Sequence, residues 1–186
     1  MKKYPVITVS GCPGSGKTTL SKRLADEFGW TRISFDDYEG MTSRAPEELA
    51  EWRKAGMPFD QLFVSDCAVD VINASERSGV VFETPLGRLH QQEGIAVAHS
   101  IWIACNLDVA LSRVLLKEVS AQDWQDIQEL QNWVKGYLEA YNDFVFEAII
   151  RQRDLVHPLA DTVLDGHRLP EEVFKTARSI LSKRFL

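Results

Sequence analysis

The sequence has little of what would mark a secreted, membrane-bound or nucleic-acid-binding protein. Its three cysteines form no CxxC pair, so neither a disulfide framework nor a structural zinc site is indicated. No apolar run approaches the ~18 residues that a membrane-spanning helix requires. The net charge is −6, which argues against nucleic acid or an anionic membrane as the main partner. These absences favour a protein of the reducing cytoplasm and leave a small molecule as the open class of partner.

What the sequence does have is an alternation of β-branched apolar runs with segments of helical periodicity. Expected strands cover residues 4–9, 30–35, 80–82, 101–105 and 161–164. Expected helices cover residues 18–28, 46–55, about 62–78, 91–98, 108–118, 124–150 (one long helix or a bent pair) and 169 onward. This order is typical of parallel strands joined by crossover helices. We therefore expect a single α/β domain over residues 1–186, with a five-stranded parallel sheet and helices on both faces.

A phosphate-binding motif lies where the first expected strand meets the first expected helix. The pattern GxxxxGKT is met by Gly11, Cys12, Pro13, Gly14, Ser15, Gly16, Lys17 and Thr18. Glycines allow successive backbone N–H groups to converge on phosphate oxygens at the positive end of the following helix. Lys17 should bridge the β- and γ-phosphates of ATP, and the Thr18 hydroxyl should ligate the Mg²⁺ that neutralises them. Thr19, next in the chain, is expected to contact the nucleotide too.

Acidic residues follow the second and third expected strands. Asp36 and Asp37 come directly after residues 33–35, and Glu83 comes after residues 80–82. Because parallel strands present their carboxyl ends at one edge, these side chains should lie near the phosphate loop. Phosphoryl transfer to an alcohol uses one carboxylate to accept the proton and another acidic group to orient Mg²⁺. We expect Asp36 in the first role and Glu83 in the second; a polar turn and a structural carboxylate are the alternatives.

These motifs resemble the P-loop nucleoside kinases, especially the uridine kinase and nicotinamide riboside kinase branch. Residues 33–38 (ISFDDY) resemble the segment in which those kinases carry a catalytic aspartate, at the position of Asp36. Residues 81–83 (VFE) are similar to a strand that ends in Glu-Gly, although Thr84 replaces the glycine here. Residues 158–165 (PLADTVLD) resemble the family's last strand. The resemblance implies a three-layer P-loop NTPase fold with a helical lid.

The lid that the resemblance implies lies at about residues 113–153. Residues 103–113 look like the strand that leads into it, with a catalytic arginine at the position of Arg113. The family's lid usually carries several arginines, whereas Val114 and Lys117-Glu118 stand in their places here. Charge on the γ-phosphate would then be neutralised by Arg113, Lys117, or Arg151 and Arg153.

The resemblance also implies that the insertions around the third strand shape the acceptor pocket. Trp52 or Phe59 would stack on the acceptor, and Asp60 or Arg88 would make polar contacts to it. Asp37 is a further candidate for substrate binding. A tryptophan on a short helix, such as Trp52, is more often a core residue than a pocket residue.

The combined pattern predicts an ATP- and Mg²⁺-dependent kinase that transfers the γ-phosphate to a hydroxyl of a nucleoside or similar metabolite. One alternative is another small-molecule or nucleoside-monophosphate kinase, similar to shikimate or gluconate kinases. A second alternative is a nucleotide-binding P-loop protein without transfer activity. The sequence leaves a homodimer open and does not identify the acceptor.

Overall fold

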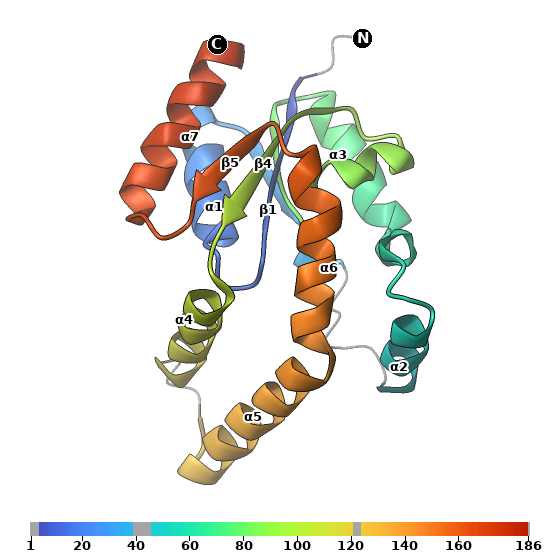
Figure 1. Ribbon diagram of the computed structural model, residues 1–186. Helices are drawn as coiled ribbons and strands as arrows, with labels where there is room; N and C mark the ends of the chain where they lie inside the picture. The colour runs from blue at the N-terminus through green and yellow to red at the C-terminus, as the bar shows by residue number, and fades with distance from the viewer. Residues whose placement is uncertain (1–3, 39–45, 121–123, 186) are drawn as a thin grey trace.

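The computed structural model describes residues 4–38, 46–120 and 124–185 (Figure 1). Its centre is a five-stranded sheet in the order β2-β3-β1-β4-β5, and all four neighbouring pairs are parallel. The strands are β1 (Val6–Gly11), β2 (Thr31–Ser34), β3 (Val80–Glu83), β4 (Val97–Ala104) and β5 (Thr162–Asp165). The central position of β1 places the loop that follows it between the carboxyl ends of β3 and β4.

Helices cover both faces of this sheet (Figure 1). The apolar side chains of α1 (Lys17–Phe28) and α7 (Pro170–Phe185) share one core cluster with alternate residues of the central strands. The helices α3 (Ser65–Ser75) and α6 (Phe146–Val156) pack on the opposite face, where the second core cluster lies. The remaining α-helices are α2 (Pro46–Lys54), α4 (Leu107–Ser120) and α5 (Ile127–Ala140). The expected α/β fold class is therefore confirmed.

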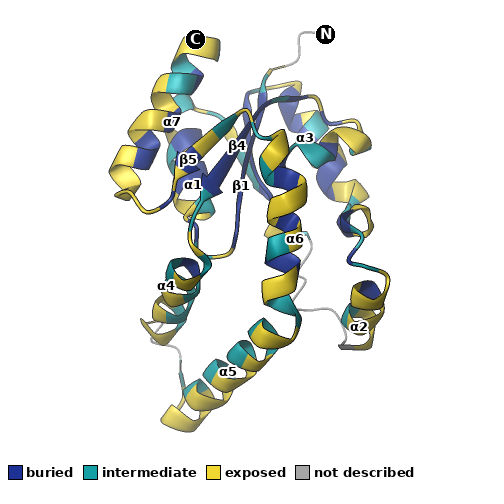
Figure 2. Ribbon diagram, viewed as in Figure 1, coloured by how far each residue is buried: buried dark blue, intermediate teal, exposed yellow. Residues whose placement is uncertain are grey.

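The burial of the strands follows from this three-layer arrangement. All six residues of β1 and all four of β3 are buried, because helices exclude water from both sides of the sheet (Figure 2). Ile7 and Val81 point into the cluster with α1 and α7, whereas Phe82 points into the cluster with α3. The near-continuous apolar runs in the sequence are the signature of such strands.

Two expected boundaries differ from the structure. Residues 91–98 were expected to be helical, but a 3₁₀ segment (Gly87–Glu93) ends at Gly94 and β4 starts at Val97. The early start of β4 reflects pairing of Val97 with Val6 of β1, a long-range contact that local periodicity does not encode. The helix expected from residue 62 begins at Ser65, because Phe59–Leu62 forms a separate 3₁₀ turn.

The expected long helical region is a bent pair, α5 and α6, joined by a π-helical turn (Tyr141–Val145). Together with α4, α5 extends beyond the carboxyl edge of the sheet, and it has no buried residue (Figures 1 and 2). Throughout the described ranges, every helix is too short or too polar to cross a lipid bilayer.

Candidate functional site

The loop between β1 and α1 has the backbone that the phosphate motif requires. Gly14 and Gly16 adopt φ angles of +79° and +103°, which favour glycine. A Cβ atom on Gly14 would lie 2.2 Å from the carbonyl oxygen of Ala110 in α4, so no other residue fits there. No side chain caps the first turn of α1, which leaves its leading N–H groups free to bind an anion. The fit of this loop to a polyphosphate is therefore good.

Lys17 lies across the loop. Its Nζ atom donates a hydrogen bond to the carbonyl oxygen of Cys12 at 3.1 Å. Burial lowers the pKa of Lys17, while the negative charges of Asp36 and Glu83 act in the opposite direction. The two carboxylates that were expected beside the phosphates thus act electrostatically on this ammonium.

Glu83 is held at the end of β3 by three donors. Oε1 accepts a hydrogen bond from the Thr18 hydroxyl, and Oε2 accepts from Ser21 Oγ at 2.8 Å and from Arg32 at 2.5 Å. Arg32 also donates from Nε to Ser21 Oγ at 3.1 Å. Burial alone would raise the pKa of Glu83, which is only 2% exposed, but these hydrogen bonds outweigh it and lower the pKa. Glu83 is therefore a fixed carboxylate that directly contacts Thr18.

Asp36 follows β2 in a short 3₁₀ turn (Phe35–Asp37). Partial burial raises the pKa of Asp36, and the negative charges of Glu83 and Asp37 raise it further. The positive charge of Lys17 acts in the opposite direction. A carboxyl group with a raised pKa is a stronger proton acceptor once ionised. Asp37, the next residue, is exposed and does not line the cleft described below.

A cleft of about 1100 Å³ runs along the carboxyl edge of the sheet. The phosphate loop forms its floor, and Lys17, Thr18, Thr19, Asp36 and Glu83 all line it. Beside β2 and β3 its wall is mainly apolar, and beside β4 and β5 it carries basic groups. The apolar side chains are those of Phe35, Phe59, Leu62, Pro85 and Ala148, and Gln152 lies among them. The basic side chains are those of Arg113, Lys117 and Arg168, beside Gly166.

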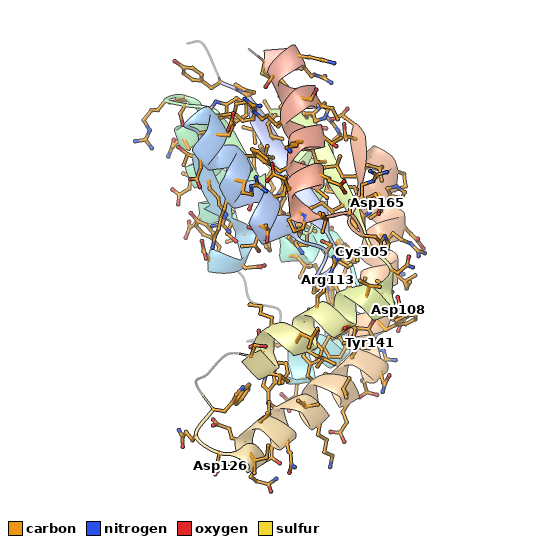
Figure 3. All side chains as sticks on the ribbon, turned by 90° about the vertical axis from the view of Figure 1, so that its left-hand side faces the viewer. Cys105, Asp108, Arg113, Asp126, Tyr141 and Asp165 are labelled. Atoms are coloured by element: carbon orange, nitrogen blue, oxygen red, sulfur yellow. The ribbon has the colours of Figure 1, made fainter. Side chains whose placement is uncertain are left out.

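Arg113 projects from α4 toward the loop after β5 (Figure 3). Its Nη1 atom donates to the carbonyl oxygen of Gly166 at 2.8 Å and lies 3.7 Å from Cys105 Sγ. Lys117, one turn further along α4, also lines the cleft. Arg151 and Arg153 of α6 are not among the lining residues, and Arg153 pairs with Asp154. Of the four candidate cations for the lid, the structure thus brings Arg113 and Lys117 to the cleft.

The aromatic candidates for the acceptor pocket take different positions. Trp52 is 4% exposed, and its Nε1 atom donates to the carbonyl oxygen of Pro58 at 3.0 Å. Its ring packs edge-on against Phe59, with centroids 5.6 Å apart, and Phe59 lines the cleft. Trp52 therefore supports the wall from behind. Asp60 is exposed and does not line the cleft.

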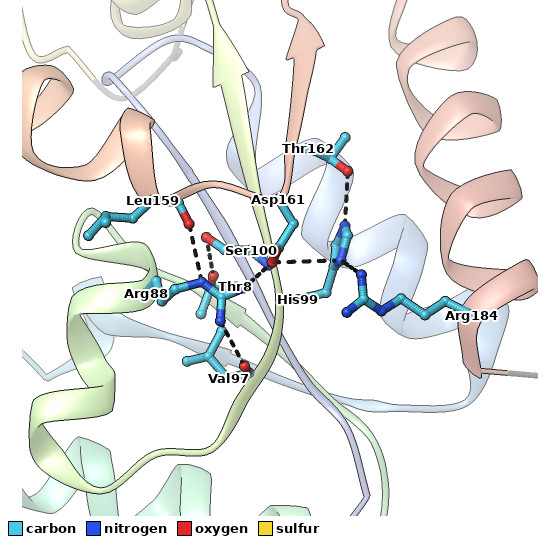
Figure 4. A network of polar contacts seen from close by, with 9 residues as sticks. All are labelled: Thr8, Arg88, Val97, His99, Ser100, Leu159, Asp161, Thr162 and Arg184. Carbon is cyan, nitrogen blue, oxygen red and sulfur yellow. Dashed lines mark hydrogen bonds and ion pairs between the residues drawn. The ribbon is translucent and has the colours of Figure 1, made fainter.

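Arg88, expected to contact the acceptor, is held away from the cleft in a separate polar network (Figure 4). It donates to the carbonyl oxygens of Leu159 at 3.1 Å and Val97 at 3.2 Å, and it pairs with Asp161. These partners lie at the start of β4 and just before β5, whereas the cleft is at the carboxyl ends of the strands. Arg88 thus connects the 3₁₀ segment to the amino ends of β4 and β5, opposite the cleft.

Three residues of this region were not anticipated from the sequence: Ser21, Arg32 and Gln152. Ser21 lies one helical turn after Thr18 and so shares its face, which is a usable signal. Ser34 of β2 pairs with Glu83 of β3, and Arg32 lies two residues before Ser34. The side chains of Arg32 and Glu83 therefore point to the same face of the sheet. That signal requires the order of the strands. Gln152 belongs to α6, and no local pattern in the sequence indicates that it meets the cleft.

Comparison with known proteins agrees with this geometry. A family model described as an AAA domain matches residues 7–133. The cytidylate kinase of Methanococcoides burtonii is 32% identical over 123 residues, which make up 63% of this chain and 66%, just under two thirds, of that protein. The cytidylate kinase of Methanopyrus kandleri is 29% identical over 182 residues, 90% of this chain and 87% of that protein.

A similar fold occurs in the crystal structure of the shikimate kinase from Acinetobacter baumannii in complex with shikimate. The TM-score is 0.54 at 17% identity, with 98% of this chain and 96% of that chain covered. These relatives support the P-loop kinases as a group and give no support to the narrower uridine kinase branch. With more than half of its length matched by the family model, the chain belongs to the AAA-domain family, among the P-loop kinases.

Proposed function

We propose that this chain is an ATP- and Mg²⁺-dependent kinase that transfers the γ-phosphate of ATP to a hydroxyl group of a small molecule. The first support is the loop between β1 and α1. The N–H groups at the uncapped start of α1 and the Lys17 ammonium would hold the nucleotide phosphates. Arg113 and Lys117, in the wall beside β4 and β5, add positive charge on the other side.

Mg²⁺ would be held by the Thr18 hydroxyl, with Glu83 orienting it or its waters, and would supply neutralisation of the phosphate charge. The Thr18 hydroxyl donates its hydrogen bond to Glu83, so the lone pairs of the hydroxyl oxygen remain available to a metal ion. Within the described residues no three His, Cys, Asp or Glu side chains gather into a metal site. That suits Mg²⁺, which takes much of its coordination from phosphates and water.

The observation that carries the hydroxyl acceptor is the placement of Asp36. Its carboxylate lines the cleft with Lys17 and Glu83, and its raised pKa makes it a proton acceptor. An alcohol must lose a proton as it attacks the phosphorus, and a carboxylate in this position can receive it.

A nucleoside-monophosphate kinase is the second candidate. It is favoured by the two cytidylate kinases, at 29% and 32% identity. In that case the acceptor would be a phosphate oxygen, which is already deprotonated at neutral pH and has no need of a base. Asp36 would then act by positioning the acceptor or the metal-bound water.

The test is ADP release from Mg²⁺-ATP over a panel of acceptors: cytidine, uridine, cytidine monophosphate, uridine monophosphate, shikimate and gluconate. Lys17→Ala gives the background rate. For a hydroxyl acceptor, Asp36→Asn should lower kcat by roughly 10²–10⁴-fold while the affinity for ATP is unchanged. For a monophosphate acceptor, the same substitution should lower kcat far less.

A wild-type protein that binds ATP but phosphorylates nothing on an extended panel would favour the remaining alternative, a nucleotide-binding protein without transfer activity. Failure of the purified protein to bind any nucleoside triphosphate, with or without Mg²⁺, would overturn the kinase proposal. Calorimetric titration with ATP and with GTP distinguishes these two outcomes.

A further inference from the structure

Gln152 of α6 is a polar side chain inside the apolar wall of the cleft. It is 5% exposed and lies on the buried face of α6, between Ile149 and Val156. It lines the cleft together with Phe59 and Leu62. A buried amide is costly unless its donors and acceptor have partners, so its presence in this wall calls for an explanation.

The amide nitrogen of Gln152 is fixed by two backbone carbonyls. Nε2 donates to the carbonyl oxygen of Pro85 at 2.8 Å and to that of Gly11 at 3.4 Å. Both partners can only accept hydrogen bonds, so a flipped amide would set its oxygen against two other oxygens. The orientation of the amide is therefore determined by the strand ends of β1 and β3.

This orientation leaves Oε1 as the group that Gln152 offers to the cleft. Among the described residues, no donor is hydrogen-bonded to Oε1. The nearby wall is apolar, formed by Phe35, Phe59, Leu62 and Ala148, and the charged groups toward the phosphate loop include the carboxylates of Asp36 and Glu83. A ligand group in this part of the cleft would thus meet a hydrogen-bond acceptor and apolar surface.

We propose that Gln152 is a specificity-determining residue for the acceptor, and that its Oε1 receives a hydrogen bond from an N–H or O–H group on a neutral ring. This inference rests on the proposed function, because it assumes that the phosphate acceptor binds against the cleft wall beside β2 and β3. The ring lies against Phe59 and Leu62, with its donor group directed at Oε1. An amino-bearing base of a nucleoside or nucleotide has this combination of properties.

The test compares binding of two ligands that differ only in the donor. Cytidine is titrated against pyrimidin-2-one riboside, the analogue in which hydrogen replaces the 4-amino group, and the corresponding monophosphates are compared in the same way. A non-hydrolysable ATP analogue with Mg²⁺ first saturates the phosphate loop, so that the ligands report on the acceptor side. Because calorimetry requires no turnover, the result is independent of the ADP-release assay.

The wild-type protein should bind the amino-bearing ligand about tenfold more tightly, as expected for one neutral hydrogen bond in a shielded site. In Gln152→Met, which keeps the shape of the side chain, this ratio should fall to about one. A matched control is Gln131→Met on the exposed surface of α5, which should keep the wild-type ratio.

Gln152→Glu is the second variant. In its protonated form the new carboxyl group can donate to Pro85 and still offer an oxygen to the ligand. The carboxylate that forms at higher pH is still an acceptor, so the preference for the amino-bearing ligand should persist in this variant, in contrast to Gln152→Met. A merely structural role would weaken both ligands equally in either variant.

An unchanged ratio in Gln152→Met, or no binding of any of the four ligands to the wild type, would overturn the assignment. A collapsed ratio with no ADP release on the whole panel would instead uphold the binding role of Gln152 and refute the proposed kinase activity.

Discussion

Replacing Arg32 with methionine removes the cation that holds Glu83 in place. Arg32 Nη2 lies 2.5 Å from Glu83 Oε2, and the side chain of Glu83 is 3% exposed. Methionine keeps most of the aliphatic stem and deletes the guanidinium. Glu83 would then keep only the hydrogen bonds from Thr18 and Ser21, with its charge still buried.

The cost can be bounded from the burial of the two partners. Removing one partner of a fully buried ion pair costs roughly 3–5 kcal/mol, because the remaining charge loses its compensation. Arg32 is 24% exposed and two hydrogen bonds remain, so water and these donors recover part of the loss. We expect the free energy of unfolding to fall by about 2–3 kcal/mol. For a chain of this length the melting temperature should fall by about 5–8 °C.

The assay is thermal unfolding at neutral pH, with Arg178→Met as the control. Arg178 pairs with Glu27 at the same distance of 2.5 Å, but both side chains are substantially exposed. Such a surface pair contributes only about 0–1 kcal/mol, so the control should lose less than about 3 °C. Equal, small losses in the two variants would refute the idea that burial of Glu83 makes its partner important.

The pH dependence gives a second check on the same substitution. Because the pKa of Glu83 is lowered by folding, its contribution to stability is present above the unfolded pKa and is lost as pH falls through the folded value. Arg32→Met raises the folded pKa. The variant should therefore differ most from the wild type near neutrality and approach it in acid, where Glu83 is protonated in both proteins.

Two further outcomes are expected. The pKa of Asp36 is raised above its ordinary value of 3.8, so kcat/KM should fall as the pH decreases through this raised pKa. A pH–rate profile whose acid limb lies at or below the ordinary value would contradict the role of Asp36 as the base. Gly136 lies inside α5 with open space at its Cβ position, so Gly136→Ala should stabilise the protein by about 0.5–1 kcal/mol. Gly29 has a φ angle of +63°, which favours glycine, so Gly29→Ala should destabilise the protein in the same thermal assay.

The order of strands and helices could be predicted from the sequence because it depends on local patterns. The phosphate motif is contiguous, so the path of the chain through Gly14 and Gly16 follows from a few neighbouring residues. The early start of β4 could not be predicted in this way. It depends on the pairing of Val97 with Val6, 91 residues away in the chain.

The cleft was only partly predictable for the same reason. Acidic residues at strand ends are visible in a sequence, and Asp36 and Glu83 do line the cleft. The wall beside β2 and β3 combines side chains from α6 with turns before and after β3, and no local pattern indicates which of them meet. Trp52 illustrates the difficulty, since its indole N–H binds Pro58 and its ring lies behind Phe59.

The π-helical turn between α5 and α6 determines which way the two helices face. One residue more than a regular turn changes the rotation of everything that follows by about 100°. Trp133 and Tyr137 of α5 stack in a row with Tyr141, the first residue of the π-helical turn. Tyr141 packs beside α4, while Gln152 lines the cleft. A single-residue deletion within Tyr141–Val145 would restore regular winding. Either the aromatic row or the amide would then turn away from its present neighbours, so this one additional residue allows the bent helix pair to make both sets of contacts.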